Sequence, residues 1–324
     1  MNAIVIHRSG GPEVLQFEDA PLPEPAAGEL RVRVSAAGLN FIDVYQRNGL
    51  YPQKLPFIPG SELAGVVDAV GAGVSRDRVG ESVAIAHNAP VGAYAQYACI
   101  PAARAVTVPT GVGVRVAAAV MLQGMTAHYL ALTTFPLAKG MTCVVHAAAG
   151  GVGLLLVQIA RLQGARVIGT VSTEEKASLA RGAGADEIIF YSRDDVALAV
   201  KRLTDGRGAD VVYDSVGKNT FEQSLASLRP RGLLVCFGQS SGAIPPFDVL
   251  QLSRAGSLFL TRPTLGHYIA TAEELQRRSG DLFRWILEGN LNVRIGAEFP
   301  LEQAAAAQRA LEGRQTTGKV LLIP

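Results

Sequence analysis

The stretch that decides the fold is Cys143-Val144-Val145-His146-Ala147-Ala148-Ala149-Gly150-Gly151-Val152-Gly153. A short apolar run ends in small residues and glycines, and an apolar helical pattern follows from Leu154 to Leu162. This order of strand, tight turn and helix is typical of the phosphate-binding start of a dinucleotide fold. Gly150 would let the backbone approach a pyrophosphate, and Gly153 would let the helix pack close to the strand. Ala148 stands where the usual pattern has its first glycine, and for the motif alone an ordinary strand-to-helix turn is the alternative interpretation.

The composition is that of a globular chain with a substantial core. The 324 residues are 48% hydrophobic and 18% charged, which is enough for two domains and argues against disorder. A net charge of +2 without any run of Lys and Arg argues against an electrostatic nucleic-acid binder. We expect no signal peptide and no uninterrupted apolar stretch long enough to span a bilayer.

The cysteines indicate the redox compartment. Cys99, Cys143 and Cys236 are odd in number and lie scattered, mostly within apolar runs. This pattern predicts buried free thiols in a reducing compartment, and we therefore expect a cytoplasmic protein.

The sequence has two parts that differ in their pattern of predicted secondary structure. The first, from Met1 to about Val108, contains short strands interrupted by proline-bearing loops, which suggests a small, partly open β-barrel. Its predicted strands are Ala3–Ile6, Glu29–Ala36, Gly65–Val70, Ser82–Ile85 and Tyr94–Ile100. A helical pattern then runs from Val116 to Ala131, and after Cys143 strands and helices alternate, which is the signature of a parallel sheet.

The alternation predicts a sheet covered on both faces, because its strands are near-continuous apolar runs. The predicted strands are Cys143–Ala147, Arg166–Val171, Glu187–Phe190, Val211–Asp214, Leu233–Phe237 and Ser257–Thr261. The predicted helices between them are Val152–Leu162, Glu174–Arg181, Asp195–Leu203, Phe221–Leu228 and Phe247–Ala255. The last elements, expected to return to the first domain, are a helix at Ala272–Glu288, a strand, a helix at Leu301–Leu311 and a final strand at Lys319–Ile323.

Several local strings resemble the zeta-crystallin-like quinone oxidoreductases, a zinc-free branch of the medium-chain dehydrogenase/reductase superfamily. They are Gly38–Asp43, Tyr51-Pro52, Pro59–Gly65, His146–Gly153, Tyr213–Gly217, Phe237–Gly242 and Thr261–Pro263, and the similarity covers Met1 to Pro324. The resemblance implies an α/β fold, with a GroES-like β-barrel catalytic domain and a Rossmann-type doubly wound parallel sheet domain. The first domain is expected over residues 1–122 and 265–324, the NADPH-binding domain over 123–264, and the two are expected to form a cleft.

Zinc ligands are missing where the zinc-dependent relatives have them. Asn40 stands in place of a cysteine, Ser61 in place of a histidine, and the third ligand would fall near Gln123. Because Zn²⁺ selects thiolate, imidazole or carboxylate, we expect a metal-free protein. Glu62, next to Ser61, is expected to pair with a nearby cation for structural reasons.

Without a Lewis acid, hydride transfer favours acceptors that are already electron-poor. Quinones fit, and so do enones, because the negative charge that develops on them delocalises. The expected function is NADPH-dependent quinone reduction, and an NADPH-dependent enone or alkenal double-bond reductase is the alternative. A non-catalytic NADPH-binding protein, in a structural or RNA-contacting role, is the alternative from another class.

The cofactor is expected to be NADPH. The second strand of the alternation ends in Val171-Ser172-Thr173, with no acidic residue at its tip to hold a ribose 2′-hydroxyl. By resemblance, Ser172, Lys176 and Tyr191 would hold the 2′-phosphate. Taken singly, Lys176 could be a solvated helix lysine and Tyr191 an aromatic at a strand end.

The resemblance also implies the remaining contacts of the cofactor. Asn40 and Thr126 would lie near the nicotinamide, and Arg314 would reach back toward the cofactor unless it is only a charge at a helix end. The other expected cofactor-binding residues are Tyr129, Gly150, Gly151, Val152, Ser215, Gly238, Gln239, Ser240 and Ser241.

The candidate catalytic residues are Asn40, Tyr45 and Tyr51. By resemblance the two tyrosines would line the acceptor pocket, where Tyr51 could donate a proton to the reduced oxygen. Packing of the loop and protonation by solvent are the alternatives. Asp43 is expected to be a structural hydrogen-bond partner.

The last predicted strand of the sheet, near Ser257–Thr261, is apolar. If its edge were left unpaired, it would be prone to aggregate by pairing with other chains. We expect a homodimer that joins two sheets there, as is common in this superfamily. A helix or loop that covers the edge within one chain is the alternative.

Overall fold

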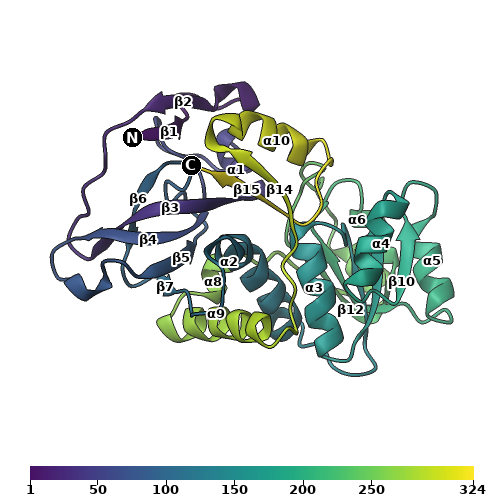
Figure 1. Ribbon diagram of the computed structural model, residues 1–324. Helices are drawn as coiled ribbons and strands as arrows, with labels where there is room; N and C mark the ends of the chain where they lie inside the picture. The colour runs from purple at the N-terminus through teal and green to yellow at the C-terminus, as the bar shows by residue number, and fades with distance from the viewer. The chain divides into compact units, whose positions relative to one another are not determined.

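The computed structural model describes residues 1–324, and the chain folds as two compact units (Figure 1). Unit 1 comprises Met1–Met125 and Leu265–Pro324, and unit 2 comprises Thr126–Thr264. The two ends of the chain therefore belong to the same unit.

Unit 2 is built on a parallel sheet of six strands in the order β10-β9-β8-β11-β12-β13. The strands are β8 (Thr142–Val145), β9 (Arg166–Val171), β10 (Glu187–Phe190), β11 (Ala209–Asp214), β12 (Leu228–Cys236) and β13 (Phe259–Thr261). Numbered by their order along unit 2, the neighbouring strands are the third, second, first, fourth, fifth and sixth, which is the strand order of the Rossmann fold. The order reverses between β8 and β11, and ligands of such sheets bind beyond the carboxyl ends of the strands at this switch point.

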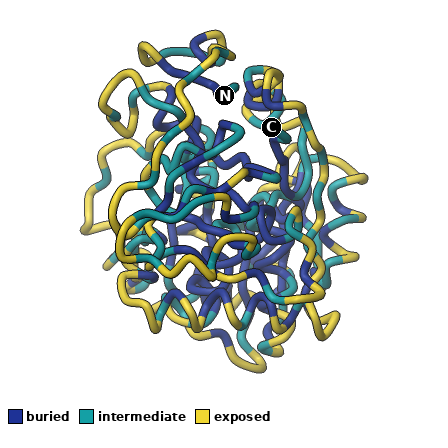
Figure 2. Tube along the Cα trace, turned by 60° about the vertical axis from the view of Figure 1, so that its left-hand side comes forward, coloured by how far each residue is buried: buried dark blue, intermediate teal, exposed yellow.

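Helices cover the sheet of unit 2. Helices α3 (Gly151–Leu162) and α4 (Glu174–Gly182) contact each other and the strands β8 to β10, while α5 (Val196–Leu203) and α6 (Phe221–Ala226) contact each other and the strands β10 to β12 (Figure 1). The central strands β8, β9 and β11 are almost wholly buried, as their apolar runs predict, and Figure 2 colours the buried stretches of the chain dark blue.

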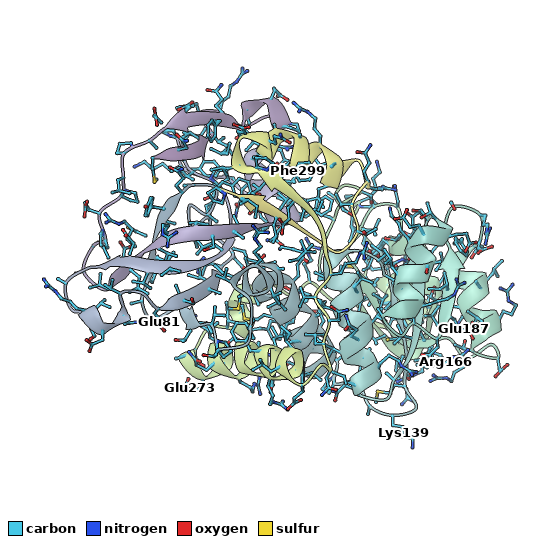
Figure 3. The ribbon with its side chains drawn as sticks, viewed as in Figure 1. Glu81, Lys139, Arg166, Glu187, Glu273 and Phe299 are labelled. Carbon is cyan, nitrogen blue, oxygen red and sulfur yellow. The ribbon has the colours of Figure 1, made fainter.

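Ion pairs mark the amino ends of the outer strands of this sheet. Arg166 at the start of β9 lies beside Glu187 at the start of β10, with Nη2 3.2 Å from Oε1 (Figure 3). Both side chains are more than a third exposed, so the pair stabilises the fold by less than about 1 kcal/mol.

Unit 1 is organised around the eleven-residue strand β3 (Glu29–Leu39). This strand pairs antiparallel with β4 (Glu62–Val70), β6 (Tyr97–Pro101) and, at its carboxyl end, β15 (Lys319–Ile323). The sheet runs in the order β14-β15-β3-β4-β5-β7, and β1 and β2 form a separate pair. The remaining strands are β1 (Asn2–Val5), β2 (Gln16–Asp19), β5 (Ser82–Ala86), β7 (Val106–Thr107) and β14 (Ile295–Pro300), on which Phe299 is labelled in Figure 3.

The helices outside the parallel sheet complete the fold. They are α1 (Phe41–Arg47), α2 (Val114–Tyr129), α7 (Leu250–Arg254), α8 (Leu265–Tyr268), α9 (Ala272–Leu287) and α10 (Ala304–Glu312). Helix α9 is capped by the preceding residue, Thr271, whose side chain accepts a hydrogen bond from the backbone of Glu274. Inside α9, the fully buried Arg278 donates from Nε to the Tyr268 carbonyl at 2.7 Å.

The predicted helix at Val116–Ala131 begins at Val114 and continues beyond Tyr129 as one π-helical turn, η3 (Leu130–Thr134). The Tyr213 hydroxyl donates toward the Leu130 carbonyl of this turn at 3.2 Å. The segment Val114–Thr134 has 21 residues, so by length and composition alone it could cross a membrane. Arg115, Gln123 and His128 interrupt this segment, so it is not an uninterrupted apolar stretch of the kind that was expected to be absent. Its most apolar window is 72% buried by the protein itself, which is typical of a core helix.

Other element bounds also differ from the predicted ones. The fifth parallel strand, predicted to begin at Leu233, begins at Leu228 and includes a register shift against β11. The edge strand predicted over Ser257–Thr261 is only Phe259–Thr261, because Ser257 adopts a left-handed backbone with a φ of 56°. Among the strands and α-helices, four short ones, β2, β7, α1 and α8, were not predicted at all.

The three cysteines are free, as predicted. Cys143 and Cys236 are buried, and Cys99 is half-buried. Burial raises the pKa of the thiols of Cys143 and Cys236 to about 12 and that of Cys99 to about 11, so all three are held as unreactive thiols.

Candidate active site

The glycine-rich turn joins β8 to α3 at the switch point of the unit 2 sheet. Gly150 is the extended residue before the helix, and Gly151 and Val152 are its first two residues. No side chain caps this 12-residue helix, so its first N–H groups are available to an anion. A Cβ added at Gly153 would collide with the Ala147 carbonyl, which explains why only glycine fits there.

A polar cluster follows the neighbouring strands β9 and β10. Val171 and Phe190 are paired at the ends of these strands, so Ser172 and Tyr191 emerge side by side. The Tyr191 amide donates to the Val171 carbonyl at 3.2 Å, and the Tyr191 ring is 38% exposed. The two strand ends thus bring together two of the three residues expected to hold a 2′-phosphate.

Lys176 lies in the first turn of α4, directly after these strand ends. Its backbone N–H donates to the Thr173 side chain, which caps the helix. Thr173 thereby fixes where α4 starts, and with it the position of the Lys176 backbone from which the side chain extends.

Arg193 is a cation of this region that sequence analysis missed. Its guanidinium lies 4.0 Å from the centre of the Phe190 ring and 3.5 Å from Oε1 of Glu174. Glu174 would otherwise present an unbalanced negative charge beside Ser172. The available signal was the short spacing between Tyr191 and Arg193.

The loops after β11 and β12 lie against each other. The Ser240 amide donates to the Ser215 carbonyl at 3.1 Å, and the Ser241 amide and hydroxyl both donate to the Val216 carbonyl. A Cβ added at Gly238 would lie 2.6 Å from the Ser215 carbonyl oxygen, so this close approach requires glycine. The structure therefore brings together most of the loop residues expected to bind the cofactor, namely Ser215, Gly238, Gln239, Ser240 and Ser241.

Two of the expected cofactor-binding residues lie on α2. Thr126 and Tyr129 are buried, with 7% and 2% of their surfaces exposed, and they stand on the last turn before the π-helical segment. Arg314 lies beyond α10, exposed, with a left-handed backbone at a φ of 57°. Its reach toward a cofactor stays a prediction.

Unit 1 contains a buried charged cluster around Asn40, the residue before α1. Lys319 of β15 contacts Glu62 of β4 as a fully buried ion pair, and its Nζ lies 2.9 Å from Asn40 Oδ1. Asn40 Nδ2 donates to Glu62 Oε2 at 2.9 Å and to the Gly38 carbonyl at 3.0 Å. Lys319 is the cation expected beside Glu62, and its place in the cluster was not predicted.

Gln123 adds one free acceptor to this cluster. Its Nε2 donates to Asn40 Oδ1 at 3.2 Å, but its buried Oε1 has no hydrogen-bond partner. All polar atoms of the Asn40 side chain are already engaged by the protein. Gln123 Oε1 is therefore the atom of this group that is best suited to accept from an N–H or O–H of a bound molecule.

Asp43 supports the same cluster from within α1. It accepts from the backbone of Asn40 at 2.9 Å, the backbone of Ser61 at 3.1 Å and the Tyr94 hydroxyl at 3.0 Å. Burial raises the pKa of Asp43 to about 6, although these hydrogen bonds and the Lys319 charge lower it. Burial also lowers the pKa of Lys319, against the attraction of Glu62.

Tyr45 and Tyr51 lie together on one side of α1. Their ring centres are 5.4 Å apart at 68°, and the Tyr51 amide donates to the Tyr45 carbonyl at 2.9 Å. Tyr45 is buried, whereas Tyr51 is 38% exposed. Of the two, only Tyr51 has a ring that is clearly open to solvent.

No three His, Cys, Asp or Glu side chains lie together in an arrangement that could hold a metal ion. At the three positions expected to lack zinc ligands, Asn40 and Gln123 donate hydrogen bonds within the cluster. Ser61 is fully buried, and its Oγ lies 3.4 Å from Gln46 Nε2. The metal-free site stays a prediction.

Two family models match the chain. The alcohol dehydrogenase GroES-like domain matches residues 26–110, and the zinc-binding dehydrogenase model matches residues 151–277. Together with the strand order of unit 2, these matches confirm the predicted fold class.

Similar proteins cover the whole chain. A quinone oxidoreductase of Pseudomonas aeruginosa is 49% identical over 97% of this chain and 97% of its own. A 2-haloacrylate reductase of a Burkholderia species is 43% identical over 99% of this chain and 98% of its own. The crystal structure of an Escherichia coli quinone oxidoreductase complexed with NADPH covers 100% of both chains, with a TM-score of 0.97 and 43% identity.

Proposed function

The chain belongs to the quinone oxidoreductases of the medium-chain dehydrogenase/reductase superfamily, and from this membership we propose that it is an NADPH-dependent quinone reductase. NADPH supplies a hydride, and an electron-poor quinone or similar conjugated carbonyl accepts it. The observation that carries the proposal is the pair of strand ends at β9 and β10, which presents Ser172 and Tyr191 together with no carboxylate at the strand tip.

Unit 2, Thr126–Thr264, would be the NADPH-binding domain. The uncapped amino end of α3, with Gly150, Gly151 and Val152, would hold the pyrophosphate. Ser172, Lys176 and Tyr191 would hold the 2′-phosphate, with Arg193 balancing the charge of Glu174. The loops that carry Ser215 and Gly238–Ser241 would lie along the cofactor.

Unit 1, which comprises Met1–Met125 and Leu265–Pro324, would supply the side chains for the acceptor. Asn40 orients Gln123, whose free Oε1 accepts from a bound N–H or O–H. Tyr45 packs against Tyr51, and Tyr51 is the side chain best able to stand by the acceptor oxygen. Because a quinol oxygen can also take its proton from water, hydride transfer does not require Tyr51 as an acid.

The chemistry of the donor set supports a metal-free site. Asn40, Ser61 and Gln123 offer no thiolate, imidazole or carboxylate to Zn²⁺, and the Lys319 ammonium already neutralises Glu62. Since an unactivated alcohol needs help to lose its proton, the protein should not oxidise simple primary alcohols.

The likeness to a 2-haloacrylate reductase favours a second acceptor class, activated double bonds. A panel of quinones, enones and alkenals with NADPH, followed by loss of NADPH absorbance, tests the proposal. Turnover of quinones supports it, and turnover of enones alone would move the assignment to a double-bond reductase. Tight NADPH binding without turnover of any acceptor would favour a non-catalytic role.

We also propose a homodimer through β13, in a cytoplasmic protein. Phe259 and Leu260 on this edge strand are 61% and 38% exposed, which a second copy pairing at the edge would cover. A monomer by light scattering at micromolar concentration would rule this out. A Leu258→Pro variant that still folds and stays dimeric would place the interface elsewhere.

A further inference from the structure

A chain of four buried polar side chains crosses the switch point of the unit 2 sheet. His146 follows β8, Thr170 lies in β9, Asp214 ends β11, and Ser224 lies on α6. Each is at most 2% exposed. None of them belongs to the cofactor-binding set described above, and burying four such groups costs free energy unless each is hydrogen-bonded.

The hydrogen bonds of this chain run in one direction. Ser224 Oγ donates to Asp214 Oδ2 at 2.8 Å, so its single hydrogen is used. Ser224 Oγ also lies 3.0 Å from His146 Nε2 and can therefore only accept there, which puts the imidazole hydrogen on Nε2. Burial lowers the pKa of His146, so the ring is neutral and its Nδ1 is an acceptor. Thr170 Oγ1, 3.0 Å from Nδ1, then donates to it.

We call this hydrogen-bonded series, Thr170–His146–Ser224–Asp214, the relay. Its two ends lie beside two loops that are expected to bind the cofactor. Asp214 Oδ1 accepts from the backbone of Val216 at 2.7 Å and of Gly217 at 3.0 Å, which fixes the loop that contains Ser215. At the other end, the Thr170 carbonyl accepts from the Ala148 amide at 3.1 Å, and the neighbouring His146 precedes Ala147, whose φ of 51° is unusual for a residue with a Cβ. This strained residue begins the glycine-rich turn.

The arrangement is not that of a catalytic triad. In a triad the carboxylate orients the histidine, whereas here Asp214 accepts from Ser224 and the free side of His146 faces Thr170. Ser224 has no exposed surface, so no substrate can reach its oxygen. The group can hold backbone in place, but it cannot act as a nucleophile.

We propose that His146, fixed as its Nε2–H tautomer between Thr170 and Ser224, is a positioning residue that locks the glycine-rich turn to the Ser215 loop for binding NADPH. This inference rests on the proposed function of unit 2. The relay stands behind the loops that both nicotinamide cofactors would share. Loss of the relay therefore weakens the binding of NADPH and the binding of NADH to the same extent, unlike the loss of a group that holds the 2′-phosphate.

The test compares Ser224→Ala with Ser227→Ala. Both serines are fully buried, but the hydroxyl of Ser227, the residue directly after α6, donates only to the Gln223 carbonyl, at 2.7 Å. We expect Ser224→Ala to raise the Kd for NADPH and the Kd for NADH by about tenfold each, because the substitution leaves buried hydrogen-bond partners unsatisfied. Ser224→Thr keeps the hydroxyl and should restore most of the affinity, whereas Ser227→Ala should change either Kd less than about twofold.

Nitrogen NMR of the histidine rings gives a readout that folding alone would not move. Wild-type protein should show one ring as a pure Nε2–H tautomer, assigned by its loss in His146→Gln, and Ser224→Ala should turn it into a mixture. A Nδ1–H tautomer in the wild type would overturn the proposal, as would unchanged affinity for both cofactors in a folded Ser224→Ala protein.

Two further outcomes, a Ser224→Ala protein that does not fold and a wild-type protein that binds no cofactor, lead to different conclusions. If Ser224→Ala does not fold, Thr170→Val removes the donor to Nδ1 at similar volume, and unchanged cofactor affinity in that variant would overturn the proposal. If wild-type protein binds neither cofactor, the proposed function of unit 2 fails. The positioning role then fails with it, whatever tautomer is found.

Discussion

Each unit of the molecule has a buried polar network, and the two are built on different physics. The cluster of unit 1 depends on a full charge pair, Lys319 with Glu62, and on Asp43 close by. The relay of unit 2 has one carboxylate, Asp214, whose partners are N–H groups and hydroxyls. Removing one member of the first leaves an unpaired buried charge, whereas removing one member of the second leaves an unmade hydrogen bond. The first network should therefore dominate stability, and the second should tune binding.

The largest effect is expected from Lys319→Met. This change leaves Glu62 buried without its cation, and breaking such a pair costs about 3–5 kcal/mol of the free energy of unfolding. Urea denaturation measures it. The double variant Lys319→Met, Glu62→Gln removes the stranded charge and should recover much of the loss. A single variant that loses less than about 1 kcal/mol would show that the pair is not buried in solution.

The pH dependence of the free energy of unfolding should show the effect of the raised pKa of Asp43. Its pKa is raised from 3.8 to about 6 by burial, so the folded protein keeps a proton that the unfolded chain has lost in this range. The free energy of unfolding therefore falls as the pH rises from about 4 to about 6, by roughly 3 kcal/mol in total. Asp43→Asn should remove this part of the pH profile. Identical slopes for the two proteins would contradict the raised pKa.

Lys176→Ala should separate the two cofactors. A charge-assisted contact with the 2′-phosphate stabilises the complex by about 1.5–3 kcal/mol, so NADPH binding should weaken at least about tenfold while NADH binding stays unchanged. Titration of both cofactors by fluorescence checks this. Equal losses, the pattern expected of Ser224→Ala, would mean that Lys176 does not contact the phosphate.

Arg193→Gln should have the smallest effect. The Arg193–Glu174 pair is more than half exposed on both sides, and such pairs contribute less than about 1 kcal/mol. NADPH should bind about two- to threefold more weakly, because Glu174 then repels its 2′-phosphate. Glu174→Gln in the same background should reverse the loss, and a failure to reverse it would remove Arg193 from the site.

Local patterns predicted the fold well and the networks poorly. The strands Arg166–Val171, Glu187–Phe190 and Lys319–Ile323 have the predicted bounds, because uninterrupted apolar runs between turn residues are local signals. The seven-residue helix α1 was missed, because two turns give too little periodicity to recognise.

The glycine-rich turn was likewise visible, since all its parts lie within eleven residues. Lys319 is 257 positions from Glu62, and Ser224 is 78 from His146, so no spacing in the sequence joins them. These contacts exist only once the sheets have formed. Resemblance identified Asn40 and Gln123, but nothing in the sequence indicated that a lysine completes their cluster.

The most direct test of the account is the reduction of a para-quinone by NADPH with protein dialysed against a chelator. We expect steady loss of NADPH absorbance, matched by quinol formation, no loss of rate after chelation, and much weaker use of NADH at the same concentration. Absence of quinone reduction by protein that still binds NADPH would contradict the proposed function. Activity that disappears on chelation and returns with one zinc ion per chain would contradict the metal-free site built from Asn40, Ser61 and Gln123.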